Sequence, residues 1–366
     1  MSLPQNQKTP IAIIGSSIAG PLLALHLLTH PLNTLYKPTI YERAESITSG
    51  AAVALTSNAL FVLYELGLRD ELDAISCETK KICIWRSLDG GKGKFLNSVK
   101  SPNWAEDLGT SLRVVERGAL VRLLVSKVRE RGGAVVFGRK VVGVLRVVDG
   151  VKVRFEDGGV VEAGLVVGAD GAWSEVRRAI IGELLKGDEG EVKDRIERRW
   201  KPEFGGADVV YGVSRSERES GQEEAGTEQG DTHWVFLDGG MASTWALPQG
   251  KVFWTLTCMS KTPPGRADRA AGEHSLYGAP VSLGGYALED TKGFLWKYEK
   301  VWHPTAGEFG NLFRNSERIV RTPLWYRAWE AEEIAGENVV LIGDAARLML
   351  PTSGQGSSSL PLMGYG

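Results

Sequence analysis

The first residues whose spacing suggests chemistry are Gly15-Ser16-Ser17-Ile18-Ala19-Gly20. They follow an apolar run typical of a strand and precede an apolar periodic segment typical of a helix. Backbone amides at such a turn, together with the helix dipole, can hold a pyrophosphate. Ser17 replaces the middle glycine of a dinucleotide site, so a plain strand-to-helix turn is the alternative. Glu42 could accept hydrogen bonds from a ribose diol or be an ordinary solvated acid.

A second motif begins at Asp170-Gly171, directly after another apolar run. Ser174 and Arg177 complete the pattern D-G-x-x-S-x-x-R. Either Asp170 or Ser174 could instead cap a helix, because each side chain can accept hydrogen bonds from free backbone amides. The pattern by itself therefore allows both a ligand site and a structural cap.

The third motif is Gly343-Asp344-Ala345-Ala346-Arg347, which also follows an apolar run. An ionised aspartate suits a polyol because it accepts two hydrogen bonds, and small residues let backbone amides reach a ring. The motif continues through small and polar residues at Pro351, Thr352, Ser353, Gly354, Gln355 and Gly356.

The three motifs, in this order, resemble those of the FAD-dependent aromatic-ring hydroxylases. These are class A flavoprotein monooxygenases similar to para-hydroxybenzoate hydroxylase and salicylate hydroxylase. Residues 50–55, with Asn58 and Gly67, are similar to a glycine-containing stretch of that family. Arg117 matches a family arginine that lies near FAD, although Arg113 could be the contact instead. The resemblance implies an α/β fold in which a Rossmann-like FAD-binding domain of the GR2 type carries an inserted mixed or antiparallel β-sheet substrate domain.

In this family the aspartate of the third motif binds the ribityl chain of FAD, and the glycine-rich turn lies against the flavin pyrimidine ring. Arg347 stands where the family commonly has histidine. Because arginine keeps its proton, a proton-carrying role at that position is in doubt. The resemblance implies cofactor-binding roles for Gly15, Ser17, Ile18, Ala19, Gly20, Glu42, Arg43, Arg113, Arg117, Asp170, Gly171, Gly343, Asp344, Ala345, Pro351, Gly354, Gln355 and Gly356.

The resemblance also implies a reaction. NAD(P)H would reduce bound FAD, O2 would add at flavin C4a, and the resulting hydroperoxide would insert one oxygen atom into an aromatic or other lipophilic small molecule. The protein would bind the flavin, orient the substrate and exclude water. We assign no catalytic residue, because no side chain is a convincing general base. Candidates for the pocket wall, which equally suit a hydrophobic core, are His233, Trp234, Phe236 and Trp245.

Two other functions stay open. A flavin-dependent epoxidase or halogenase could use the same scaffold, although the sequence contains no halogenase W-x-W-x-I-P segment and residues 245–248 are only superficially similar to one. The other is a truncated flavoprotein with little or no activity. Family members continue with a helix after the Gly-Gln-Gly turn, whereas Pro361 and the glycines after it oppose one here. We therefore expect a chain truncated at its C-terminus, with weak FAD retention.

Hydrophobic periodicity and turn residues predict the elements that must position these motifs. Strands over 10–14 and 39–41 flank a helix over 21–28 and complete a βαβ unit. A second helix is predicted over 117–131, and the charge-rich stretches 183–200 and 215–231 are expected to be exposed connections. Further strands are predicted over 141–148, 151–155, 160–162, 165–169, 209–213, 233–237, 243–247, 252–258 and 338–342.

The motifs also suggest how the chain divides into domains. The FAD-binding domain and the substrate domain are each expected to be assembled from separate segments. The expected segments are 1–75, the FAD-binding βαβ part; 76–110, a substrate-domain segment; 111–182, the FAD-binding part with the Asp-Gly motif; 183–330, the substrate domain with its antiparallel sheet; and 331–366, the FAD-binding part with the Gly-Asp motif.

Composition limits the partners. Hydrophobic residues make up 43% and charged residues 24% of 366 residues, and the formal net charge is -2, so neither nucleic acid nor a membrane surface is an expected partner. A small-molecule substrate and O2 are expected, and the oligomeric state is left open. The three cysteines lack C-x-x-C spacing, which predicts no metal site and favours a reducing, cytoplasmic compartment. Glycine, serine and proline interrupt the signal-peptide-like stretch 11–28.

Overall fold

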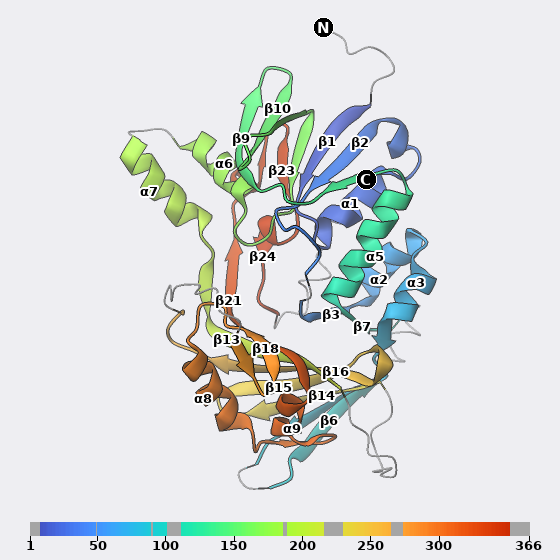
Figure 1. Cartoon of the computed structure of the whole chain (residues 1–366), viewed down its shortest axis with the longest axis vertical. Helices are drawn as coiled ribbons and strands as arrows, with labels where there is room; N and C mark the ends of the chain where they lie inside the picture. Colours follow the sequence, from blue (N-terminus) through green and yellow to red (C-terminus); the bar gives the residue numbers. More distant parts are fainter. Residues whose placement is uncertain are drawn as a thin grey trace.

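A computed structural model describes residues 8–48, 50–88, 91–100, 111–185, 189–215, 230–264 and 274–351. Gly354, Gln355, Gly356 and the predicted irregular C-terminal end lie outside these residues, as does most of the stretch 215–231. Two large sheets dominate the fold, one at the top and one at the bottom of Figure 1. In the part of the chain that the structure describes, no helix is long and apolar enough to cross a membrane.

The upper sheet has six strands, and five of them run parallel. Its central strands are apolar and buried, with Ile13, Ile40 and Val166 completely covered, as expected for a parallel sheet with both faces packed. The strands, in spatial order, are β22 (Ala335–Gly336), β23 (Val339–Leu341), β12 (Leu165–Gly168), β1 (Thr9–Ile14), β2 (Tyr36–Tyr41) and β8 (Ala134–Val136).

Different elements cover the two faces of this sheet. One face packs against helices α1 and α5, and the other against α6 and a small antiparallel sheet (Figure 1). The helices around the sheet are α1 (Ala19–Leu27), α2 (Ser57–Glu65), α3 (Arg69–Ile75), α5 (Arg117–Glu130), α6 (Glu175–Leu184), α7 (Glu189–Trp200) and α10 (Ala331–Ile334), with short turns η1 (Leu32–Thr34) and η3 (Gly343–Ala345). The small sheets are β9 (Val141–Val147), β10 (Gly150–Phe155) and β11 (Val160–Ala163), and β3 (Ala52–Leu55), β7 (Arg113–Glu116) and β4 (Ser76–Glu78).

The lower sheet has ten strands and is mixed, because β14 pairs in parallel with β5, and β18 with β21, while the other pairs are antiparallel. Its strands are β17 (His274–Leu276), β18 (Ala279–Ser282), β21 (Ser316–Ala328), β13 (Glu203–Arg215), β16 (Lys251–Met259), β15 (Gly240–Ala246), β14 (Asp231–Leu237), β5 (Lys81–Arg86) and β6 (Lys94–Lys100), with β24 (Arg347–Leu348) beside β21. The remaining elements are η2 (Pro248–Gly250), α8 (Leu288–Tyr298), β19 (Trp302–His303), β20 (Gly307–Glu308) and α9 (Phe309–Arg314).

The two faces of the ten-stranded sheet differ in what covers them. Helices α8 and α9 pack on one face, where Phe309 and Phe313 join Trp254 in a buried cluster. On the other face Phe253 packs with Val114 of β7, so this face looks toward the six-stranded part. The strands of the six-stranded sheet come from the predicted segments 1–75, 111–182 and 331–366, although the domain boundaries themselves stay a prediction.

The structure corrects one of the expected exposed connections. Residues 183–200 are expected to be an exposed connection, yet helix α7 occupies most of them. Val192, Ile196 and Trp200 are four residues apart and form an apolar stripe that packs against the end of α6. The stripe is difficult to recognise in the sequence because only every fourth residue of α7 is apolar and most of the others are charged.

Because side chains alternate along a strand, one predicted pocket-wall residue, His233, faces away from the six-stranded sheet. His233 lies on the face of the ten-stranded sheet that α8 and α9 cover, opposite to Trp234. Its ring is buried beside His303, with ring centroids 5.6 Å apart, and its Nδ1 accepts a hydrogen bond of 3.2 Å from Trp85 Nε1. His233 therefore belongs to the core rather than to the wall of a substrate pocket.

This buried histidine predicts sensitivity to acid. Burial, with a smaller contribution from Lys81, lowers the pKa of His233 to about 4. The histidine of the unfolded chain is protonated below about pH 6.5, whereas His233 of the folded protein stays neutral down to about pH 4. The free energy of unfolding therefore decreases as the pH falls from 6.5 to 4, by about 3 kcal/mol in total. We expect His233→Gln to flatten the dependence of unfolding free energy on pH between 6.5 and 4.

The control for this measurement is His274→Gln on β17, outside the buried pair. Part of the slope should remain in His233→Gln, because burial also lowers the pKa of His303. Equal slopes in the wild type and His233→Gln, measured by urea denaturation at each pH, would contradict the assignment.

Candidate cofactor site

The first motif forms a tight turn at the carboxyl end of β1. Gly15 has a φ of 107°, and a Cβ placed on it would lie 2.3 Å from the carbonyl oxygen of Ala169. A Cβ on Gly20 would lie 2.1 Å from the carbonyl oxygen of Gly15. Both positions therefore require glycine. Ser17 is exposed, which explains why the middle position tolerates a side chain.

Glu42 fastens this turn to the end of β2. Its Oε2 accepts hydrogen bonds from the backbone N of Ser16 at 2.8 Å and from Ser16 Oγ at 2.9 Å, and its Oε1 accepts one from Ala44 N at 3.0 Å. Glu42 is therefore not an ordinary solvated acid. Arg43 beside it is exposed. A contact of either residue with a ribose stays a prediction.

The Asp-Gly motif combines a helix cap with an unused acceptor. Asp170 Oδ2 accepts hydrogen bonds from Glu175 N and Val176 N at 2.8 and 3.3 Å, and Ser174 Oγ accepts one from Arg177 N at 2.9 Å. The capping alternative is therefore part of the geometry. Asp170 Oδ1, however, is buried without a partner among the described residues, and burial raises the pKa of this carboxyl group. An unpaired buried acceptor suits a ligand donor.

Arg177 connects the second and third motifs, a role that sequence reasoning missed. Its guanidinium is fully buried and donates to the carbonyl oxygens of Ala345, Ala172 and Trp200, the last at the end of α7. The indole ring of Trp329 lies 3.6 Å from the guanidinium carbon. Burial lowers the pKa of Arg177 to about 10, so the side chain stays charged at neutral pH. The sequence signal was the D-G-x-x-S-x-x-R spacing, but the partners are mostly backbone atoms.

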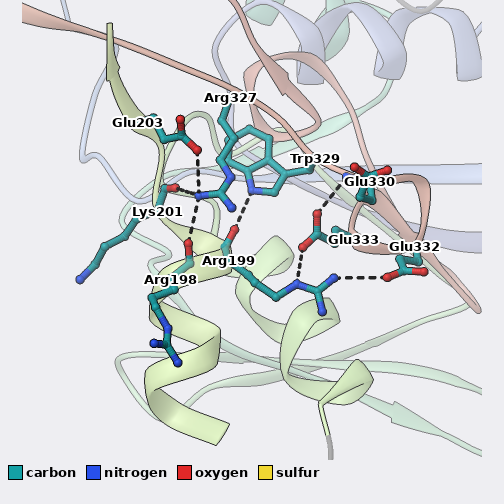
Figure 2. Close-up of polar contacts among 9 residues, drawn as sticks. All are labelled: Arg198, Arg199, Lys201, Glu203, Arg327, Trp329, Glu330, Glu332 and Glu333. Carbon is teal, nitrogen blue, oxygen red and sulfur yellow. Dashed lines mark hydrogen bonds and ion pairs between the residues drawn. The ribbon is translucent and has the colours of Figure 1, made fainter. Parts of the chain in front are cut away.

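Trp329 is itself held in place by the polar cluster shown in Figure 2. Its Nε1 donates to the carbonyl oxygen of Arg199 at 2.9 Å. Arg199 Nε in turn donates to Glu333 of α10 at 2.6 Å, and Arg327 Nη1 donates to the carbonyl oxygen of Lys201 at 2.7 Å. The end of α7, the end of β21 and α10 therefore fix the ring on which Arg177 rests.

The Gly-Asp motif lies against the first motif. Gly343 has a φ of 59°, and a Cβ on it would lie 3.0 Å from Ala19 Cβ, at the start of α1. Asp344 follows at the surface of this turn, and Ala345 is buried. Neighbouring protein atoms partly desolvate the Asp344 carboxyl and so raise its pKa, whereas the positive charge of Arg117 lowers it. The structure thus brings Asp344, Ala19 and Arg117 to one region.

Arg117 and Arg113 have different surroundings. Arg117 lies over Gly50, where a Cβ would be only 2.7 Å from the guanidinium Nε, and its charge acts on Asp344. Arg113 points to α3 and the start of β4: its Nε donates to Ser76 Oγ of β4 at 2.8 Å, and its Nη2 donates to the carbonyl oxygen of Asp73 in α3 at 3.3 Å. The geometry favours Arg117 as the cofactor contact, which stays a prediction.

The remaining predicted residues lie around this region or at its edge. Gly171 has a φ of 81°, and no atom of the described residues lies within 4 Å of the position that a Cβ would take, so that part of the structure leaves space beside it. Pro351 is exposed at the end of the described chain, and Arg347 is exposed on β24. Two surface hollows of about 210 and 520 Å³ lie elsewhere, beside Arg154 and beside Trp296. The first hollow meets the second motif only at Glu175, one of its variable positions, and the second hollow meets none of the motifs, so the motif geometry rather than a hollow defines the candidate site.

The electrostatic effect of Arg117 on Asp344 can be tested through pH. Arg117→Met removes the charge that lowers the pKa of Asp344, so that pKa should rise. Because only the ionised carboxylate is a full acceptor for a polyol, we expect the variant to release FAD at a higher pH than the wild type does. Flavin fluorescence followed during acid titration measures this release.

Arg113→Met is the matched control, because its guanidinium is used by α3. It should lower stability while releasing FAD at the wild-type pH. A larger shift in Arg113→Met than in Arg117→Met would show that the two arginines have been assigned the wrong way round.

Comparisons with known proteins identify the family. A model of the FAD binding domain matches residues 8–198, which is more than half of the chain. The chain is 26% identical over 349 residues to 3-amino-4-hydroxybenzoate 2-monooxygenase of Streptomyces cremeus, covering 95% of this chain and 75% of that protein. The chain therefore belongs to the family of FAD-dependent monooxygenases of the aromatic-hydroxylase type that share this FAD-binding domain. The predicted family, enzyme class and FAD cofactor are confirmed.

Solved structures confirm the predicted fold. HpxO of Klebsiella pneumoniae in complex with FAD and uric acid superposes with a TM-score of 0.72 at 18% identity, covering 96% of this chain and 77% of that one. The 2,6-dihydroxypyridine-3-hydroxylase of Arthrobacter nicotinovorans gives a TM-score of 0.66 at 20% identity, covering 97% and 81%. At such identities the likeness concerns the fold alone.

Proposed function

We propose that this protein uses NAD(P)H and O2 to insert one oxygen atom into an aromatic or other lipophilic small molecule. The relative from Streptomyces cremeus is named for oxygenation of an aminohydroxybenzoate, and the Arthrobacter protein for hydroxylation of a pyridine. The observation that carries the proposal is the meeting of the Gly-Asp turn with the start of α1, where Arg117 also acts on Asp344.

The residues at this meeting point fit FAD. Amides of the first turn and the start of α1 would hold the pyrophosphate, and Asp344 would accept hydrogen bonds from the ribityl chain. Asp170 Oδ1, which has no partner among the described residues, and the space beside Gly171 suit a polar group near the second motif. Bound FAD would supply electron uptake from NAD(P)H and oxygen activation at flavin C4a.

The protein's own part is to position the substrate and keep water away. The face of the ten-stranded sheet that looks toward the six-stranded part carries Tyr211, Trp245 and Phe253 in an otherwise apolar cluster. Such a wall can orient a flat ring and exclude water from the oxygen-transfer step. No described side chain needs to act as a general base in this proposal.

The proposal is tested with the full chain incubated with FAD and freed of excess cofactor. We expect a flavin absorbance spectrum, oxidation of NADH or NADPH coupled to O2 uptake, and a product labelled by ¹⁸O2 when phenolic substrates are added. The Asp344→Ala variant should lose the spectrum and the product together. Retained flavin with NAD(P)H oxidation that yields only hydrogen peroxide across the substrate panel would refute oxygen insertion.

A further inference from the structure

A straight row of side chains crosses four strands on the face of the ten-stranded sheet that looks toward the cofactor site. Tyr211 of β13 pairs directly with Thr255 of β16. Ser243 of β15 pairs with both Thr255 and Trp234 of β14. Directly paired residues project to the same face, so the four side chains form one line across the sheet.

The middle of this row satisfies its own hydrogen bonds. Ser243 Oγ and Thr255 Oγ1 are 2.7 Å apart, and Trp245 Nε1 donates to Ser243 Oγ at 3.1 Å. The polar groups there are therefore already occupied by one another.

The far end of the row does not satisfy its hydrogen bonds. Trp234 Nε1 is buried and has no acceptor in the part of the chain that the structure describes. Thr232, fully buried two residues earlier on the same face, has a hydroxyl that also lacks a partner there. Buried donors are normally paired, and one left unpaired is costly. An oxygen acceptor from a bound molecule would remove that cost.

The near end of the row lies close to β7, because Tyr211 packs in one apolar cluster with Val114 of that strand. The charges of Arg117 and Arg318 both lower the pKa of Tyr211, against the effect of burial, which raises it. Strand β7 leads directly into Arg117, whose charge also acts on Asp344, so Tyr211 is the end of the row nearest to the predicted cofactor contacts. Three strand spacings separate Tyr211 from Trp234, which is about 14 Å. A single aromatic ring is too short to use both ends.

We propose that this row selects a substrate of at least two fused rings, whose far end carries a carbonyl or similar oxygen that accepts a hydrogen bond from Trp234 Nε1. This inference rests on the proposed function, because it takes the row as the wall of the oxygenation site. Trp234 is then the residue that determines specificity, and the aromatic rings of Trp234 and Trp245, with centroids 6.2 Å apart, form the wall at that end.

The test compares two neutral ligands that differ by one acceptor, 2-acetyl-6-hydroxynaphthalene and 2-naphthol. Binding to the FAD-loaded full chain is measured by calorimetry without NAD(P)H, so that no turnover is needed. We expect the wild type to bind the ketone about tenfold more tightly than the naphthol, and Trp234→Phe to remove this preference. Trp234→Phe should also melt no lower than the wild type, because it removes an unpaired donor and keeps an aromatic ring.

Trp245→Phe is the matched control, because its indole N–H is already used by Ser243. It should retain the preference for the ketone. The inference is overturned if the wild type shows no preference, if Trp234→Phe keeps it, or if Trp245→Phe loses it as well. A bound ketone that yields no oxygenated product would refute the proposed function and leave the assignment of Trp234 intact.

Discussion

Arg177→Met is expected to lower the free energy of unfolding by about 3–5 kcal/mol. The guanidinium is fully buried and donates to three backbone carbonyl oxygens, which would be left without a donor. The variant also removes the positive charge that acts on the buried Asp170. Because Ala345 would lose its tie to α6, FAD affinity should fall along with stability. Urea denaturation of the apoprotein and flavin titration measure the two effects.

The neighbouring Arg178 provides the control on the same helix. It is partly exposed and pairs with Glu197 at 2.8 Å, and surface pairs contribute little, so Arg178→Met should cost less than about 1 kcal/mol. Arg177→Lys keeps a charge but lacks the planar fork, and should fall between the two. Similar losses in Arg177→Met and Arg178→Met would contradict the role of Arg177 as the tie between motifs.

The second large effect is expected for Gly15→Ala. The new Cβ would lie 2.3 Å from the carbonyl oxygen of Ala169, and the residue would keep a φ of 107°, so the ends of β1 and β12 must move apart. That movement displaces the amides that would hold the pyrophosphate. With each charge-assisted hydrogen bond contributing about 1.5–3 kcal/mol, FAD affinity should fall by about a hundredfold. Equilibrium titration followed by flavin fluorescence gives this value.

Gly67→Ala is the control that separates the effect of backbone strain from the effect of a steric clash with the new Cβ. Gly67 also has a positive φ, of 72°, but within the described ranges no atom lies within 4 Å of its Cβ position. It should therefore cost only about 1 kcal/mol of stability and leave FAD affinity unchanged. If Gly15→Ala bound FAD as tightly as Gly67→Ala does, the first turn would not be part of the cofactor site.

The motifs and their order were predictable because positions where two backbone segments approach closely require glycine, and glycine is visible in the sequence. Gly15, Gly20 and Gly343 each occupy a position where a Cβ would meet another atom at 3.0 Å or less, so only glycine fits without a shift. Apolar runs before them predicted the strands of the six-stranded sheet. These signals identified the family and the cofactor, while the individual cofactor contacts stay predictions.

The features that sequence reasoning missed depend on interaction partners that no particular residue type reveals. The three acceptors of Arg177 are backbone carbonyl oxygens, which every residue type provides. The different roles of Arg113 and Arg117 depend on which neighbours surround each guanidinium, and His233 could be assigned to a face only once the sheet was known. Helix α7 was missed because charged residues separate its three apolar positions.

The ten-stranded sheet has a consequence for protein engineering. Strands β5 and β6 come from residues 81–100, whereas β13 to β16 and β21 come from residues 203–328. In a chimera that exchanged only residues 203–328, β14 would come from one family member and β5 from another. The two strands pair directly at Trp234, so the mismatch would lie beside that residue. Recombination between family members should therefore transfer both stretches together, and libraries with a single crossover are expected to yield mismatched sheets.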